Sequence, residues 1–341
     1  MSDPTRVLIA GANGHLGRRL IARLSPSVPI VATVRSSTAR RAIEQTVASI
    51  ERGAASSESA ATSIENAAAS VESAAASVEI IELDYRDAGA LADAADGCAV
   101  AVNLVGILKQ TAANRYVDAH ERATEALVVA AHARQLRRIV YVSILGSDPN
   151  SPNAALASKG RAERILLASG VPTLILRVPM VLGEGDYASG ALRRRAHSRV
   201  AFLVRGASLE QPIYAGDVVD AIVVGIALTG RDNIVLDLAG PESLSRTDLV
   251  ERAGACVGNR PMRISLPLAP VLGLAWFAER LMTNPPVTRA MLEVLDHDDC
   301  IDPMPAAAKL GIRLTPLDEM LAASLSDNKG IRAPFRGGKA V

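Results

Sequence analysis

The stretch RVLIAGANGHLG, residues 6–17, decides the fold. Its beginning is apolar and reads as a buried β-strand, and residues 15–24 have the spacing of an amphipathic helix. Gly11, Gly14 and Gly17 stand between the two. Glycines at this spacing permit a tight turn and let the backbone approach a pyrophosphate, which the helix N-terminus attracts. The stretch predicts a dinucleotide-binding βα unit; a glycine turn without a ligand is the alternative.

Five further apolar segments read as buried strands, with helical stretches between them. Nearly continuous Val, Ile and Leu are typical of parallel strands covered on both faces. The segments are residues 29–35, 78–84, 99–106, 138–146 and 173–183. We therefore predict the α/β class: a Rossmann-like doubly wound parallel sheet over residues 1–184 and a smaller C-terminal α/β domain over residues 185–326. The Gly- and Arg-rich tail, residues 327–341, is expected to be disordered.

An insertion at residues 48–78 carries a seven-residue repeat. Ser-X-Glu and closely similar triplets begin at residues 49, 56, 63, 70 and 77, and Ala fills most other positions. Only one apolar position in each heptad is larger than Ala, whereas a stable coiled coil needs two. We expect an exposed extension of the second crossover helix, and a partner-binding helix is the alternative.

Composition excludes several classes of function. The 341 residues carry a net charge of +1 and 3% aromatic residues, which argues against nucleic-acid binding. The three cysteines are far apart and form no CxxC pair, so we expect no metal site and a reducing compartment. No signal peptide is evident, and the longest apolar run, residues 266–278, is shorter than the about 20 residues a bilayer span needs. These features favour a cytoplasmic protein.

The end of the second strand predicts which nicotinamide nucleotide binds. Arg35 stands where an acidic residue would accept from the 2′-hydroxyl of NAD, and Ser36 follows it. Because Arg suits a phosphate, we favour NADP(H). Arg40 or Arg41 lies close enough to assist, unless both are surface charges. Asp84 ends the third strand and either accepts from the adenine amino group or caps the next helix.

Other predicted cofactor contacts lie at the carboxyl edge of the sheet, where nucleotides bind in doubly wound folds. They come from the glycine loop, from the ends of the third, fourth and sixth strands, and from the helix after the fifth strand. They are Asn13, His15, Leu16, Tyr85, Val105, Gly106, Lys159, Val178 and Pro179.

The motifs together resemble the extended short-chain dehydrogenase/reductase superfamily. Within it they resemble the atypical branch of the NAD(P)H-binding accessory subunit of respiratory complex I and its bacterial homologues. The resemblance covers residues 5–325 apart from the repeat. It rests on GANGHLG, VNLVGIL, VYVSILGSDPNSP, SKGRAE, LRVPMVLGEGD, QPIYAGDVVDAI, LAGPESLSRTDLV and PPVTRAMLEVL. It implies a Rossmann-like domain with a small C-terminal domain over the nucleotide.

The resemblance also implies a catalytic segment, from which this chain departs at one position. In catalytic relatives a Ser matching Ser143 orients a carbonyl, a Tyr matching Ala155 moves the proton, and a Lys matching Lys159 holds the nicotinamide ribose. With Ala155 in place of Tyr, Lys159 either donates the proton itself or only binds the ribose. Tyr187 is the reserve donor. His120 is expected to pack a helix.

Three hypotheses follow. The chain holds NADP(H) with little turnover in a membrane-associated respiratory or quinone-biosynthesis assembly, as the resemblance implies; it is an NADP(H)-dependent reductase or epimerase that uses Lys159; or it is a nucleotide-responsive regulator. The basic run at residues 193–199 and the apolar residues 268–282 are consistent with a surface peripheral to the inner membrane. A solvated basic helix and a packed apolar helix are the alternatives.

Overall fold

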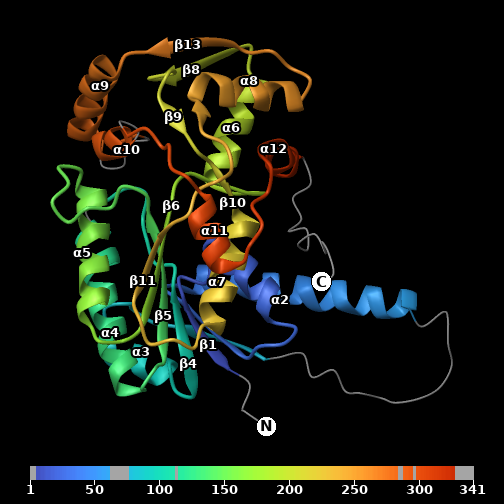
Figure 1. Ribbon diagram of the computed structural model, residues 1–341, viewed down its shortest axis with the longest axis vertical. Helices are drawn as coiled ribbons and strands as arrows, with labels where there is room; N and C mark the ends of the chain where they lie inside the picture. The colour runs from blue at the N-terminus through green and yellow to red at the C-terminus, as the bar shows by residue number, and fades with distance from the viewer. Residues whose placement is uncertain (1–4, 62–76, 112–113, 283–286, 295–296, 327–341) are drawn as a thin grey trace.

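The central sheet has seven strands, all parallel, in the order β11-β6-β5-β4-β1-β2-β3 (Figure 1). The computed structural model describes residues 5–61, 77–111, 114–282, 287–294 and 297–326. The strands are β1 (Arg6–Ala10), β2 (Ile30–Val34), β3 (Val78–Glu82), β4 (Cys98–Asn103), β5 (Arg138–Ile144), β6 (Thr173–Val178) and β11 (Ile234–Asp237). The order reverses between β1 and β4, so the predicted doubly wound fold is confirmed.

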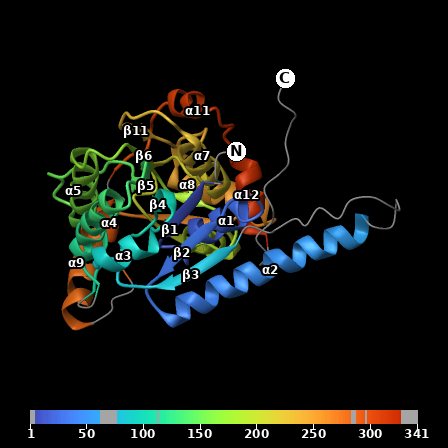
Figure 2. The same cartoon turned by 90° about the horizontal axis from the view of Figure 1, so that it is seen from below.

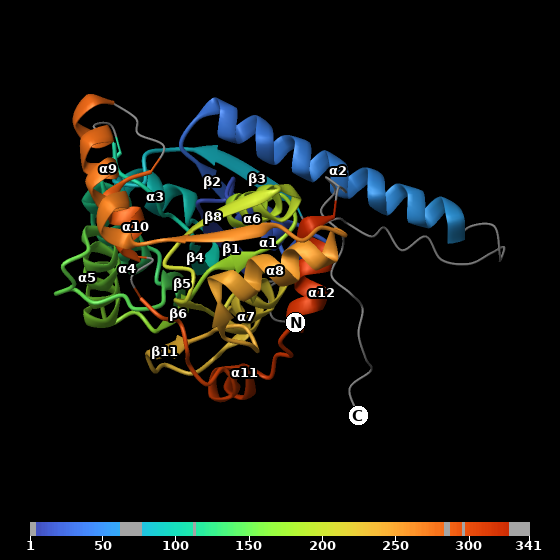
Figure 3. The same ribbon diagram turned by 90° about the horizontal axis from the view of Figure 1, so that it is seen from above.

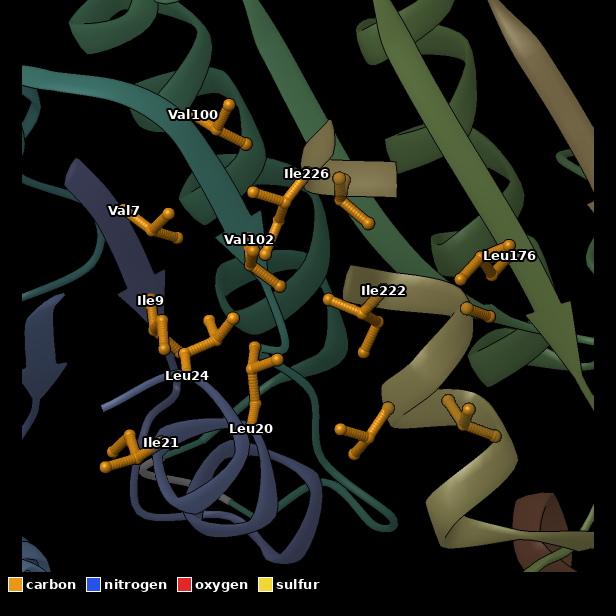
Figure 4. Packing of buried hydrophobic residues seen from close by; sticks show 14 of the residues in the cluster. Val7, Ile9, Leu20, Ile21, Leu24, Val100, Val102, Leu176, Ile222 and Ile226 are labelled. Carbon is orange, nitrogen blue, oxygen red and sulfur yellow. The ribbon is translucent and has the colours of Figure 1, made fainter. Parts of the chain in front are cut away.

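Helices cover both faces of the sheet, which explains why its strands are apolar on both sides. One face packs against α1 (His15–Leu24), α2 (Ser37–Ala61) and α7 (Ala215–Ala227). Figure 4 shows Leu20 and Ile222 from two of these helices against Val102 of β4. The other face packs against α3 (Ala88–Ala94), α4 (Ala123–Ala133), which a π-helical segment (Val117–Arg122) precedes, and α5 (Ala154–Ala168).

A smaller layer lies over the carboxyl ends of the strands, with its own apolar core (Figure 1). It contains short strands and helices: β7 (Val181–Leu182), α6 (Tyr187–His197), β8 (Val200–Val204), β9 (Leu209–Glu210), β10 (Ile213–Tyr214), β12 (Leu244–Ser245), α8 (Arg246–Cys256), β13 (Met262–Leu266), α9 (Leu268–Leu281), α10 (Arg289–Val294) and α12 (Leu317–Leu325). Helix α11 (Met304–Leu310) packs instead in the core of the large sheet. The chain returns to the large sheet for α7 and β11, so the boundary at residue 184 stays a prediction.

A buried ion pair joins α1, beside the large sheet, to the smaller layer. Arg19 on α1 contacts Glu184, which follows β7, at 2.6 Å, and both side chains are under 10% exposed. The hydroxyl of Tyr214 on β10 also donates to the Glu184 carboxylate at 3.0 Å. Helix α1, which follows the glycine loop, is therefore held against the smaller layer by this ion pair.

Helix α2 includes the first part of the insertion. It runs for 25 residues and extends well beyond the body of the protein (Figure 2). Ile43 packs in the core near its start. The predicted helical extension is thus present up to Ala61, and the remaining repeats, residues 62–76, lie outside the described residues, as does the tail.

Candidate nucleotide-binding site

The glycine loop has the geometry that close approach to a ligand requires. Gly11 has a φ of 83°, and a Cβ there would lie 2.9 Å from the Leu104 carbonyl carbon. A Cβ on Gly17 would lie 2.4 Å from the Ala12 carbonyl oxygen. A Cβ on Gly14 would meet only the Gly11 carbonyl oxygen, at 3.4 Å. Gly11 and Gly17 are thus required by the fold, whereas Gly14 leaves one side of the loop open.

The N-terminus of α1 adjoins this open side. Gly14 is its N-cap residue and provides no side-chain cap, so the first-turn N–H groups are available to an anion. His15 and Leu16 in that turn are half-buried, and burial followed by Arg18 and Arg19 lowers the pKa of His15. The residues fit a dinucleotide pyrophosphate: open backbone, free helix N–H groups and nearby cations.

A cavity of about 480 Å³ continues from the loop across the carboxyl ends of β2 and β3. Its lining joins the two predicted nucleotide determinants, Arg35 and Asp84, with Val105 after β4 and with residues before and at the start of α4. The lining residues are Asn13, Arg35, Ser36, Ala39, Leu83, Asp84, Tyr85, Arg86, Val105, Asn114, Asp118, Ala119 and Ala123. This is the place of the adenosine in a doubly wound fold.

Arg86 is one of several residues of this cavity that the sequence did not predict. Its guanidinium makes a forked contact with Asp84, with the shortest distance 2.6 Å, and this bond holds the pKa of Asp84 near 2. The Arg35 guanidinium donates to the Asn114 side chain at 3.1 Å. Two guanidinium groups thus line the adenosine end. The D-Y-R order was the available signal, because the Arg lies only two residues after Asp84.

Tyr85 supports the cavity from inside. The Gly11 N–H donates to its hydroxyl at 3.0 Å, and the hydroxyl donates to the Thr33 carbonyl at 2.7 Å. Burial raises the Tyr85 pKa, so the group stays protonated and can make both bonds. Asp84 does not cap the next helix; the side chain of Asp87 does, through the Ala90 N–H.

Lys159 lies at the opposite, reaction end of the site. It comes from α5, whose first turn Asn153 caps. Its ammonium donates to the Val142 carbonyl at 3.0 Å and stands 4.5 Å from the Tyr141 ring centroid. Burial lowers its pKa to about 8. A Cβ on Gly106 would lie 3.6 Å from the Lys159 Nζ, so these two residues, each predicted to contact the cofactor, lie close together.

His120 also reaches this end. Its Nε2 would lie 3.8 Å from a Cβ on Gly106 and accepts from the Ile107 N–H at 3.4 Å. Its ring stacks on Tyr116, as a packing role predicts. Burial, then the charge of Lys159, lowers its pKa to about 3, so the imidazole is neutral.

The groups expected to handle the substrate are not poised for it. The Ser143 hydroxyl donates to Glu163 at 2.5 Å and lies 3.1 Å from the Ser147 hydroxyl. Glu163 is in turn paired with Arg177 at 2.6 Å. Ser143 is therefore part of a buried polar network. Ala155 offers no proton.

The remaining predicted residues differ in their surroundings. Tyr187 begins α6, is 58% exposed and makes no hydrogen bond to any described residue. Val105 lines the cavity, and its N–H donates to the Asn103 side chain. Val178 and Pro179 are buried where β6 ends, outside that lining. In the described ranges, no group of acidic, Cys or His side chains has the arrangement of a metal site.

The family model for NAD(P)H-binding proteins matches residues 64–199. The 40 kDa subunit of NADH-ubiquinone oxidoreductase from Neurospora crassa is 23% identical over 226 residues, 66% of this chain and 59% of the relative. A ceramide reductase from Caulobacter vibrioides is 26% identical over 179 residues, 52% of this chain and 56% of the relative. The chain thus spans less than two thirds of the length of either curated relative.

Solved structures share the fold over nearly the whole chain. The NADPH-dependent quinone oxidoreductase QOR2 of Escherichia coli, complexed with NADPH, has a TM-score of 0.65 at 20% identity, covering 93% of this chain and 98% of its own. MoeE5, in complex with UDP-glucose and NAD, has a TM-score of 0.66 at 18% identity, covering 94% and 97%.

The family model and the fold identify an NAD(P)H-binding domain of Rossmann architecture, which the chain shares with solved structures of the extended short-chain dehydrogenase/reductase family. More particularly, the chain is homologous to the 40 kDa subunit of respiratory complex I. Both expectations from the sequence motifs are confirmed.

Proposed function

We propose that the protein binds NADP(H) and holds it with little or no turnover. A contrast inside one site supports this. The glycine loop and the cavity lined by Arg35 and Arg86 have the features that nucleotide binding needs. The reaction end, in contrast, has Ala155 at the proton-donor position and a Ser143 hydroxyl already bonded to Glu163. Hydride transfer to a carbonyl needs a proton for the oxyanion, and a positioned general acid contributes about 10²–10⁴-fold.

The preference for NADP(H) over NAD(H) rests on charge. Arg35 and Arg86 both line the adenosine cavity, and the pair formed by Arg86 neutralises Asp84, the acid beside it. A 2′-phosphate fits two guanidinium groups better than a 2′-hydroxyl does, because each guanidinium makes charge-assisted hydrogen bonds to phosphate. Ser36, in the same lining, adds a hydroxyl.

We further propose a setting beside a membrane-bound respiratory or quinone-biosynthesis assembly, with the protein cytoplasmic and peripheral to the inner membrane. The Neurospora relative, a subunit of NADH-ubiquinone oxidoreductase, supports this proposal. In the described part of the chain, no helix is both long and apolar enough to cross a membrane.

The test is absorbance in the reduced-nicotinamide band. Purified protein is saturated with NADPH and then mixed with quinones and carbonyl compounds in turn. We expect the nucleotide to remain bound and reduced. Oxidation that depends on the protein, at a rate typical of reductases, would contradict the proposal.

A second candidate is a reductase that uses Lys159 as its proton donor. The lowered pKa, about 8, supports it, because an ammonium of that pKa gives up its proton far more readily than an ordinary lysine. In such a reaction the substrate carbonyl would gain a hydride from NADPH and a proton from Nζ. Lys159→Met would then abolish turnover. Turnover that survives this substitution would rule out this mechanism.

A further inference from the structure

The outward side of α9 has the wrong polarity for a helix facing water. Leu274, Phe277 and Leu281 share one side by their spacing and are 69%, 55% and 70% exposed. Trp276 and Met282 beside them are 44% and 48% exposed. A helix on the surface of a globular protein normally turns polar side chains outward. Here only Ala275 is fully buried.

The polar residues of α9 do not interrupt this apolar side. Glu279 is held by Arg289 of α10 at 2.9 Å and is only 23% exposed. Arg280 lies next to the apolar side, with its guanidinium 4.9 Å from the ring of Trp276. Trp and Arg placed together at the edge of an apolar helix face are typical of a helix lying in a membrane interface, where the charge reaches the headgroups.

A second apolar face belongs to the two-stranded sheet that leads into α9. Ile264 pairs with Phe202 across β13 and β8, and their neighbours at two-residue spacing point the same way. Phe202 and Met262 on this face are 58% and 59% exposed. On the opposite face, Ala201 and Leu203 of β8 pack in the C-terminal core, whereas Arg263 of β13 pairs with Glu251 and Ser265 is exposed. All six outward residues are apolar: Val200, Phe202, Val204, Met262, Ile264 and Leu266. Figure 1 shows β8, β13 and α9 at the top of the molecule, and Figure 3 looks down on this end.

Basic side chains border this end. A cavity of about 470 Å³ is lined by Gly190, Arg193, Arg194, His197 and Ser198 of α6 and its C-cap. The Ser198 hydroxyl donates to the Val200 carbonyl at 2.9 Å, so the cavity adjoins the start of β8. Arg199 and Arg260 are exposed at the same edge, where the Met262 N–H donates to the Arg199 carbonyl. An apolar surface bordered by cations matches an anionic bilayer.

We propose that the outward faces of α9 and of β8 with β13 dock on the surface of an anionic lipid bilayer, with headgroup phosphates in the cavity of α6. The contact is peripheral: the apolar side chains enter the interface and the arginines stay among the headgroups. This deepens the membrane-side part of the proposed function. NADPH binding is measured in parallel, so that the nucleotide site and the docking surface can fail separately.

The test uses the intrinsic fluorescence of the full chain. Trp276 is its one tryptophan and lies on the proposed surface. Vesicles of phosphatidylcholine mixed with phosphatidylglycerol should shift its emission to shorter wavelength and cosediment with the protein. Vesicles of phosphatidylcholine alone should bind more weakly, and salt should weaken the binding to the mixed vesicles.

Matched variants locate the contact. Leu274→Glu and Phe277→Glu should each lower the vesicle-bound fraction roughly tenfold or more, because each removes a large apolar side chain and adds a charge that anionic lipid repels. Arg194→Gln should lower binding to mixed vesicles by a factor of roughly three to ten. Val129→Glu is the control: Val129, on α4, is 57% exposed but lies outside the surface, and its variant should bind as the parent does.

Three results would overturn the proposal. The first is a lack of binding to mixed vesicles by the folded, NADPH-binding protein. The second is binding that Leu274→Glu and Phe277→Glu leave unchanged. The third is self-association without lipid binding, detected by light scattering and abolished by Phe277→Glu, which would assign the face to a second copy of the chain.

Discussion

The adenosine end of the nucleotide site has the side chains that binding needs, whereas the reaction end lacks some of those that catalysis needs. At the adenosine end, Arg35, Arg86 and Asn13 of the glycine loop line one cavity. At the reaction end, Lys159 keeps its place beside Gly106, but Ala155 carries no hydroxyl and Ser143 is bonded elsewhere. Apart from Lys159, the residues predicted to bind the adenosine part of the nucleotide and those predicted to act on a substrate are different, so nucleotide binding could be kept while catalysis is reduced.

The largest effect should come from a substitution that disrupts the glycine loop. Gly17→Val should destabilise the protein by about 3 kcal/mol or more and abolish NADPH binding, since even a Cβ would lie 2.4 Å from the Ala12 carbonyl oxygen. Thermal unfolding and NADPH titration measure both effects. In Gly14→Ala, where the structure has space, the fold should survive and only nucleotide affinity should fall. Equal melting temperatures for the parent and Gly17→Val would show that the loop geometry is wrong.

The reaction end can be rebuilt instead. Ala155→Tyr restores a phenol one helical turn before Lys159, so it should raise carbonyl or quinone reduction by about 10²-fold if the missing acid is what limits turnover. Ala155→Phe is the control of equal bulk. A gain with Phe as large as with Tyr would show that size and not the proton matters. No gain with either would point to the Ser143 network as the second obstacle.

The adenosine end can be made selective for the other nucleotide. Arg86→Ala and Arg35→Ala should each weaken NADPH roughly tenfold, the loss expected for a charge-assisted phosphate contact, and should leave NADH nearly unchanged. Arg122→Ala, exposed and paired with Asp118 outside the proposed phosphate contact, is the comparison. Isothermal titration with both nucleotides gives the ratio. Equal losses of affinity for NADPH and NADH would show that these arginines do not bind the 2′-phosphate.

Lys159 adds a pH dependence to the stability of the nucleotide-free protein. Its folded pKa, about 8, is below the ordinary 10.5, so between these values the unfolded chain binds more protons. The stability contributed by this group therefore rises with pH from about 8 to 10.5, by about 1 kcal/mol or more. Denaturant unfolding of the parent and of Lys159→Met should diverge across this window. Parallel curves would mean that Lys159 is not buried as described.

The smallest effect should come from Ser143. If its hydroxyl serves the Glu163 network, Ser143→Ala should cost about 1 kcal/mol of stability and change any residual turnover less than about threefold. Urea unfolding and initial rates suffice. A loss of turnover near 10²-fold with unchanged stability would show instead that Ser143 contacts the substrate.

Patterns local in sequence predicted most of the fold and one end of the site. Apolar runs located six strands of the sheet, and the glycine spacing located the loop, because both depend on a few adjacent residues. The seventh strand, β11, comes from residues assigned to the other half, and its pairing with β6 is a long-range choice. Arg86 was missed since its role depends on a side-chain fork, and the bond between Ser143 and Glu163 depends on how α5 packs against β5.

The buried pair of Arg19 and Glu184 limits how the protein could transmit a signal. Arg19 belongs to α1, whose N-terminus is the proposed pyrophosphate site, while Glu184 follows β7 of the smaller layer. Moving the two layers apart would break both contacts of the Arg19 guanidinium with Glu184, one to the backbone carbonyl and one to the carboxylate. When a nucleotide binds, the Arg19–Glu184 ion pair already joins α1 to the smaller layer. A message from the cofactor to a distant partner must pass through local rearrangement of side chains and loops, and not through domain closure.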